Sequence, residues 1–140
     1  MLRAVAARPL LLVLAACALA GCGEEGPSDE QRIRSTLTAF GRATAEGDYR
    51  ALCDRILAPE LVDTIRRIGL PCEVALERGF EDVREPRLTV GTVTVDGDAA
   101  TAQVRSSAAG QAASNDSVAL VRVGEDWRIA SLSGSPGTGP

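Results

Sequence analysis

The chain has four cysteines and no histidine, and this combination limits the chemistry that its side chains could perform. A cysteine thiolate is a strong nucleophile, and two thiols of an exported protein can form a disulfide. Without an imidazole there is no Ser–His or Cys–His nucleophile pair and no histidine zinc triad. Cys53 and Cys72 also lack the CxxC spacing of zinc sites. We therefore predict no catalytic residue, no metal site and no cofactor.

The first two cysteines, Cys17 and Cys22, belong to an apolar leader. Arg3 and Arg8 precede an apolar run, "LLLVLAACALA", that is shorter than the about 20 residues of a membrane-spanning helix. A positive segment followed by a short apolar one is the layout of a secretory signal peptide. The run ends in "LAGC", residues 19–22, in which a branched apolar residue and two small residues precede a cysteine.

This ending resembles the lipobox of bacterial lipoproteins. The resemblance implies that Cys22 carries a thioether-linked diacylglyceryl group and that the chain is cleaved just before it. Acyl chains on Cys22 would then hold the protein on the extracytoplasmic face of the cell membrane. The alternative is an ordinary signal peptide that is cut after Ala18 or Ala20 and leaves Cys22 free.

The other two cysteines lie in the body of the chain. Cys17 leaves with the leader and Cys22 takes the lipid, so Cys53 and Cys72 are left over. Leftover cysteines of an exported chain generally pair. We predict a Cys53–Cys72 disulfide, and the alternative is two buried free thiols.

Composition divides the chain into four segments. Residues 1–21 form the predicted signal peptide, 22–28 a lipidated linker, 29–133 one folded domain and 134–140 a flexible tail; linker and tail are rich in Gly, Pro and Ser. The 15 basic and 19 acidic residues give a formal net charge of −4. Such a chain offers no basic face, so nucleic acid is not an expected partner.

The first half of the domain is predicted to be helical. "SDEQ" from Ser28 fits a capping box, and apolar residues then recur at helical spacing up to Gly47, which predicts a helix over 29–46. Asp48 can cap a second helix over 49–57, and Pro59 suits the first turn of a third. A short helix over 71–78, closed by Gly79, would follow.

After Pro86 the hydrophobic period changes to that of strands. "RLTVGTVTVDGDAATAQV" predicts a β-hairpin with a type I′ turn at Asp96-Gly97. Leu88 and Val90 have even numbers, whereas Val93 and Val95 have odd numbers, so a regular strand would place the two pairs on opposite faces. One bulge at Gly91 would bring all four onto one face. Counted from this turn, the expected pairs are Val95–Asp98, Val93–Ala100, Val90–Ala102 and Leu88–Val104.

A second hairpin is predicted in "NDSVALVRVGEDWRIASL". Gly124-Glu125 can form its turn, with glycine first as type II′ requires. Leu120 then faces Ile129, and Arg122 faces Trp127, so that the guanidinium can stack on the indole. The small polar stretch over 106–116 is predicted to be a mobile loop between the hairpins.

Helices followed by a curved four-stranded meander make an α+β domain. This order resembles the nuclear transport factor 2-like superfamily, the cone-shaped fold that is shared with ketosteroid isomerase and the SnoaL-type polyketide cyclases. The residues that carry the resemblance are "AFGRATAEGDYRALCDRI" (39–56), "LTVGTVTVDGDAATAQV" (88–104) and "VRVGEDWRIASL" (121–132). It implies a pocket between the long helix and the concave sheet.

Three functions fit such a fold. The first is a non-catalytic binding or accessory module whose concave sheet, with Val90, Val93, Ala102, Leu120 and Ile129, faces a small apolar ligand, an envelope protein or the core. The second is an isomerase or cyclase that uses a carboxylate inside the cone, and the third is an interaction protein that forms a homodimer through its sheet. The aromatic residues Phe40, Tyr49 and Trp127 are candidates to line the pocket, and the alternative is that they belong to the core.

Overall fold

The computed structural model describes residues 26–134. The predicted signal peptide, the lipobox with Cys22 and most of the predicted tail lie outside the described residues. Within them, no helix is long and apolar enough to cross a membrane.

The long helix α1, Asp29–Glu46, begins and ends as the sequence predicts. The Ser28 hydroxyl accepts a hydrogen bond from the Gln31 amide at 3.2 Å, and the Gln31 side chain accepts one from the Ser28 amide at 2.8 Å. These two bonds form the capping box. Gly47 ends the helix at φ +69°, a left-handed conformation that favours glycine.

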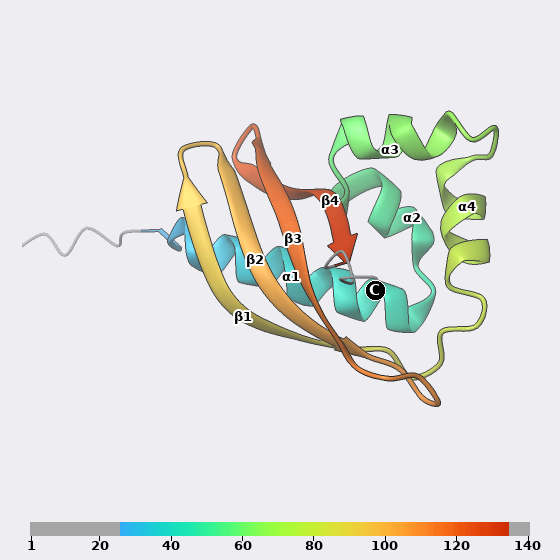
Figure 1. Ribbon diagram of the computed structural model, residues 1–140. Coiled ribbons are helices and arrows are strands. Elements are labelled where there is room, and N and C mark those ends of the chain that lie inside the picture. The colour runs from blue at the N-terminus through green and yellow to red at the C-terminus, as the bar shows by residue number, and fades with distance from the viewer. Residues whose placement is uncertain (1–25, 135–140) are drawn as a thin grey trace, which may run out of the picture.

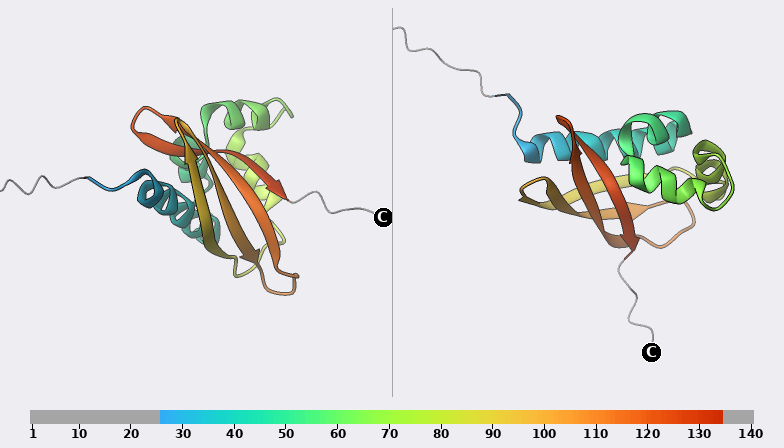
Figure 2. Two further views of the ribbon diagram at one scale, coloured as in Figure 1. Left: turned by 60° about the vertical axis from the view of Figure 1, so that its left-hand side comes forward. Right: turned by 90° about the horizontal axis from the view of Figure 1, so that it is seen from above.

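Four short helical segments follow and gather at the C-terminal end of α1 (Figure 1, Figure 2). They are α2 Tyr49–Ala51, η1 Leu52–Ile56, α3 Pro59–Arg66 and α4 Cys72–Gly79. The prediction of one α-helix over 49–57 is wrong in detail, because the chain widens into a π-helix at Leu52. Asp48 caps α2 by accepting a hydrogen bond from the Ala51 amide at 2.9 Å. Gly79 is the last residue of α4 rather than its cap.

The structure contains the Cys53–Cys72 disulfide, which ties η1 to α4. Cys72 is fully buried and Cys53 is nearly so. Short helices contribute few core residues and depend on tertiary support, so the cross-link fixes the position of α4 on the rest of the domain.

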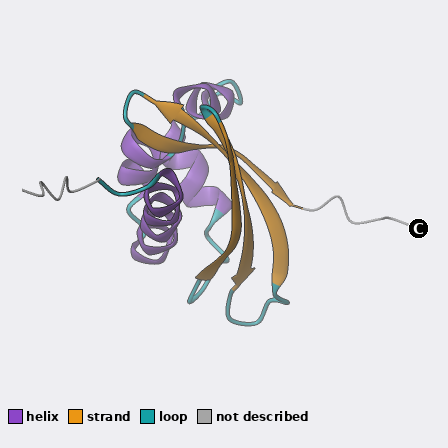
Figure 3. Cartoon of the chain, turned by 90° about the vertical axis from the view of Figure 1, so that its left-hand side faces the viewer, coloured by secondary structure: helices purple, strands orange, loops and turns teal. Residues whose placement is uncertain are grey.

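The sheet has four antiparallel strands in the order β1-β2-β3-β4. They are β1 Arg87–Asp96, β2 Ala99–Ser107, β3 Ser114–Val123 and β4 Asp126–Gly134. All helices lie on one side of the curved sheet (Figure 3). The α+β architecture is therefore as predicted.

The first hairpin is bulged where the sequence predicts, between Val90 and Val93. A Cβ on Gly91 would lie 3.2 Å from the Gln103 carbonyl oxygen, so a larger residue would press on β2.

The predicted pairing of β1 with β2 is wrong by two residues, since Val93 pairs with Ala102 rather than with Ala100. The turn residues are Gly97 and Asp98, and of these only Gly97 has positive φ, as in type II′. A shift of two leaves every side chain on its predicted face.

The second hairpin has the predicted register, with Leu120 opposite Ile129 and Arg122 opposite Trp127. The sequence did not predict the second bulge. It lies at Ala130, which has no partner because Leu120 pairs with Ile129 and the preceding Ala119 pairs with Ser131. The prediction of a loop over 106–116 is wrong at both ends, because β2 continues to Ser107 and β3 begins at Ser114. Cross-strand pairing therefore extends into a stretch whose small polar residues suggested a loop.

Both edge strands of the sheet are bonded to α1. Arg34 donates to the carbonyl oxygens of Val90 and Gly91 at 3.3 and 2.9 Å, at the bulge of β1. On the other side of the helix, the Thr36 hydroxyl donates to the Trp127 carbonyl oxygen in β4 at 2.9 Å. Arg34 therefore holds the helix to the strand at the point where the bulge interrupts the ladder.

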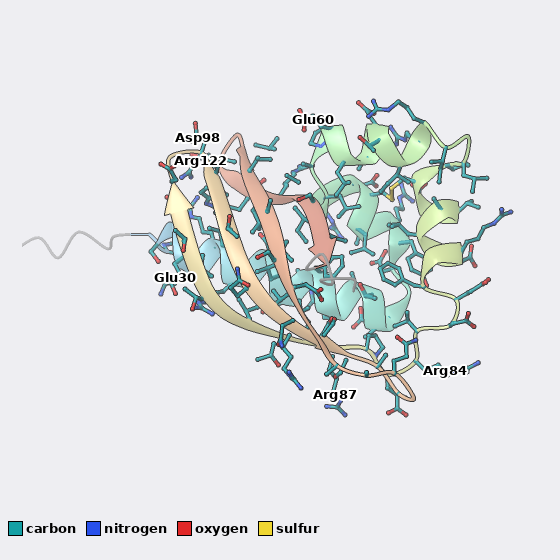
Figure 4. The ribbon with its side chains drawn as sticks, in the orientation of Figure 1. Glu30, Glu60, Arg84, Arg87, Asp98 and Arg122 are labelled. Carbon is teal, nitrogen blue, oxygen red and sulfur yellow. A yellow bond between two sulfur atoms is a disulfide. The ribbon has the colours of Figure 1, made fainter. Side chains whose placement is uncertain are left out.

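An ion cluster fixes the N-terminal end of α1 on the second hairpin. The Asp29 carboxylate accepts from Arg122 at 2.7 Å and from the Trp127 indole at 3.1 Å. Arg122 also binds Asp98 at 3.0 Å, and the two residues lie side by side in Figure 4. Its guanidinium lies 4.6 Å from the centre of the Trp127 ring, which confirms the predicted stacking. Hydrogen bonds from Arg122 and then from Trp127 hold the pKa of Asp29 below its ordinary 3.8.

Removal of the disulfide tests its contribution to stability. We expect the double variant Cys53→Ala, Cys72→Ala to lose about 3 kcal/mol of unfolding free energy, because the unfolded chain is no longer cross-linked. Urea denaturation followed by circular dichroism measures the loss. A reducing agent should lower the stability of the wild type by a similar amount and leave the variant unchanged; a wild type insensitive to reduction would contradict the prediction.

The Asp29 cluster predicts a pH dependence. Because the pKa of Asp29 is lowered in the folded state, its contribution is present above pH 3.8 and is lost as the pH falls below that value. The wild type should therefore lose more thermal stability than Asp29→Asn between about pH 6 and about pH 3. Melting temperatures across this range measure the difference, and parallel curves for the two proteins would show that the cluster does not couple to folding.

Candidate ligand cavity

A cavity of about 350 Å³ opens between α1, the α4–β1 connection and the inner face of the sheet. Its volume is at the lower end of the range for small-molecule sites. The apolar part of its wall comes from both layers of the fold. These residues are Leu37, Phe40, Val83, Phe80, Leu88, Val104, Val118 and Leu132.

The cavity exists because the strands extend beyond the residues that α1 covers. Gly41 lets the helix approach β1 closely, since a Cβ there would lie 3.3 Å from the Leu88 Cβ. Further along, Val104 and Val118 are buried, whereas Leu132 is 48 % exposed. Leu132 therefore adds an accessible apolar side chain to the wall of the cavity.

One side of the cavity is polar. The Asp116 Oδ2 atom accepts hydrogen bonds from the Ser114 hydroxyl at 2.7 Å and from the Ser106 hydroxyl at 3.2 Å. The two serine oxygens lie 2.8 Å apart. Asp116 is half-buried, and it has the same parity on β3 as Val118 and Leu120, which are buried on the inner face. The carboxylate therefore lines the cavity from the sheet side.

The structure does not bring the three candidate aromatic residues together. Phe40 lines the cavity. Tyr49 instead stacks on Phe80, with ring centres 6.3 Å apart. Of these two stacked rings, Phe80 lines the cavity and Tyr49 does not. Trp127 is buried at the other end of α1, bonded to Asp29, and it borders a separate polar groove. Tyr49 and Trp127 therefore do not line this cavity: Trp127 belongs to the core and Tyr49 packs against it, which is the alternative that the sequence left open.

The predicted concave surface is observed. Ala102, Leu120 and Ile129 are buried, and Val90 and Val93 pack against them as half-buried residues. These five residues form core beneath α1, and the cavity lies beside them. Among residues 26–132 no polar or charged residue is buried.

Sequence reasoning missed Asp116 and its two serines because it assigned them to a loop. The signal was present in the alternation of β3. Counting back by two from Leu120 passes through Val118 to Asp116, which places the carboxylate on the apolar face.

The chain resembles three solved structures across most of its length. A protein of unknown function from Silicibacter pomeroyi, described as NTF-2 like, has a TM-score of 0.53 at 22% identity, covering 72% of this chain and 89% of that one. A de novo designed NTF2 fold protein has a TM-score of 0.52 at 16% identity, covering 79% and 90%. The fold is nuclear transport factor 2-like.

The third of these structures is described by a sequence motif rather than by a fold. It is a SEC-C motif containing protein from Rhodopseudomonas palustris, with a TM-score of 0.51 at 18% identity, covering 76% of this chain and 78% of that one. No family model matches the chain, and no curated protein matches its sequence. At these identities the likeness concerns the fold alone, and function has to be argued from the cavity.

Proposed function

We propose that this protein is a membrane-anchored extracytoplasmic lipoprotein whose domain is a non-catalytic module that binds a small apolar molecule. The observation that carries the proposal is the cavity beside α1, whose wall is mainly apolar and includes the half-exposed Leu132. Apolar walls with few polar groups are typical of small-molecule sites. The lipobox at residues 19–22 supports the anchor.

A second candidate is an isomerase or cyclase that uses a carboxylate in the cone, and Asp116 is the observation that favours it. Such chemistry needs a hydrogen-bond donor for the developing oxyanion, which related isomerases take from a tyrosine or a protonated aspartate. The chain's single tyrosine, Tyr49, does not line the cavity, and Asp116 is the one acidic residue among the described residues that do. The binding module is therefore the better supported of the two.

A blocked cavity tests the binding function. Thr44 lines the cavity from α1, and a Thr44→Phe substitution would fill space beside Phe40. We expect the wild type to bind a neutral apolar fluorophore such as Nile red in stoichiometric amount and Thr44→Phe to bind it at least about tenfold more weakly, because the buried apolar contact is lost. Fluorescence titration measures both affinities.

Thr64→Phe is the matched control, because Thr64 lies exposed on α3 and does not line the cavity. It should bind the fluorophore as the wild type does. Equal affinity in Thr44→Phe and wild type, with both proteins folded, would place the binding elsewhere and remove the support for the cavity.

The anchor has a separate test. We expect Cys22→Ala to move the protein from the membrane fraction to the soluble fraction, because the proposed acylation site is lost. Cys17→Ala is the matched control, since Cys17 lies in the segment that is removed, and it should stay in the membrane fraction. Immunoblots of fractionated cells decide the matter, and a Cys22→Ala protein that stays with membranes would contradict the anchor.

A further inference from the structure

We propose that the cavity selects amphiphiles whose polar end is a hydrogen-bond donor, an ammonium or hydroxyl group, and that Asp116 makes this selection. The inference rests on the proposed binding function and specifies the class of ligand. It follows from the way in which polar groups are distributed around the cavity.

The apolar wall and the polar side lie together in one space. Phe40 and Phe80 contribute to the wall from the helices, and Leu88 and Leu132 contribute to it from the two edge strands. Asp116 and its serines lie on β2 and β3 between those edges. A ligand with its hydrocarbon part against the leucines could therefore place its polar end at Asp116.

The Asp116 side of the cavity offers acceptors. An ionised carboxylate accepts hydrogen bonds and donates none. Both serine hydroxyls lie within hydrogen-bond distance of Oδ2 and of each other, so their hydrogens are used within this cluster rather than on a ligand. Oδ1 takes no part in those two bonds. An ammonium group there would form a charge-assisted hydrogen bond, whereas a carboxylate on the ligand would meet a like charge.

Two of the lining side chains carry nitrogen donors, Gln111 and Arg87. The Gln111 amide, which lines the cavity, donates to the Asp82 carbonyl oxygen at 3.3 Å. Arg87 is the one basic residue among the lining residues that the structure describes. It has the opposite parity to the inward Leu88 on β1, and its exposed side chain points away from the sheet in Figure 4. An anionic head group would therefore find no basic side chain turned toward it among the described lining residues.

Three ligands with a ten-carbon chain test the inference at neutral pH: decylamine and decanoate below their critical micelle concentrations, and decanol below its solubility limit. We expect the wild-type protein to bind decylamine at least about tenfold more tightly than decanoate, with decanol between them. In Asp116→Asn the ratio of decylamine to decanoate affinity should fall to about one, while decanol binding persists. Isothermal titration calorimetry gives the affinities, and melting curves show that the variant is folded.

Asp63→Asn is the matched control for the loss of one negative charge. Asp63 is exposed on α3, outside the cavity, so this variant should keep the wild-type ratio. A wild type that binds all three ligands equally, or an Asp116→Asn variant that keeps the preference, would overturn the inference and leave the binding function standing. A folded wild type that binds none of the three would overturn both.

Discussion

The helix α1 is hydrogen-bonded to both edge strands of the open sheet, β1 and β4, and the rest of the structure depends on this arrangement. Arg34 bonds to β1 at its bulge, and Thr36 bonds to β4. Because β1 and β4 are the first and last strands, a helix that contacts both requires the sheet to curl around it. The bulges at Gly91 and Ala130 supply the bend. The β4 edge is covered further by the Ala58 amide, which donates to the Ile129 carbonyl oxygen at 2.8 Å, and unpaired edges invite association.

The position of the cavity follows from how α1 is fixed along the curved sheet. Its N-terminal end is fixed by Asp29 to Arg122 and Trp127, and its middle by the close approach of Gly41 to Leu88. The apolar face of the sheet is covered along this length and is open beyond it. At the open end the inward positions change from valine to serine and aspartate, so the cavity has an apolar wall and a polar side. The disulfide holds α4, which carries Phe80 at its C-terminal end, beside this opening.

Local signals in the sequence were sufficient for most of the fold. Ser28 and Gln31 defined the start of α1, and the parity change at Gly91 required a bulge. The errors came where two local solutions differ little in energy. Asp96-Gly97 and Gly97-Asp98 can both form a tight turn, and the longer cross-strand pairing decides between them. The π-helix at Leu52 has no local signal that we can identify.

The cavity was less predictable than the fold because it depends on where the strands end. Small polar residues such as Ser106 and Ser114 are typical of loops, and only the pairing of β2 with β3 keeps them in the sheet. The isolated parallel bridge between Leu57 and Ile129 is another result of tertiary packing that the sequence did not predict. For Phe40, Tyr49 and Trp127 the sequence left pocket and core as alternatives, and only the packing shows that Phe40 lines the cavity whereas Trp127 belongs to the core and Tyr49 packs against it.

The most direct test of the account is native mass spectrometry of the protein as isolated from its source cells. The account predicts that a fraction of the wild-type protein carries a noncovalent small molecule, which is released on collisional activation and is absent from a protein whose cavity is blocked. The released mass would identify the ligand, and an amine or alcohol with a hydrocarbon body would agree with the polar side at Asp116. A wild-type protein that carries no adduct and takes up none of the offered apolar ligands would contradict the claim that this cavity is a binding site.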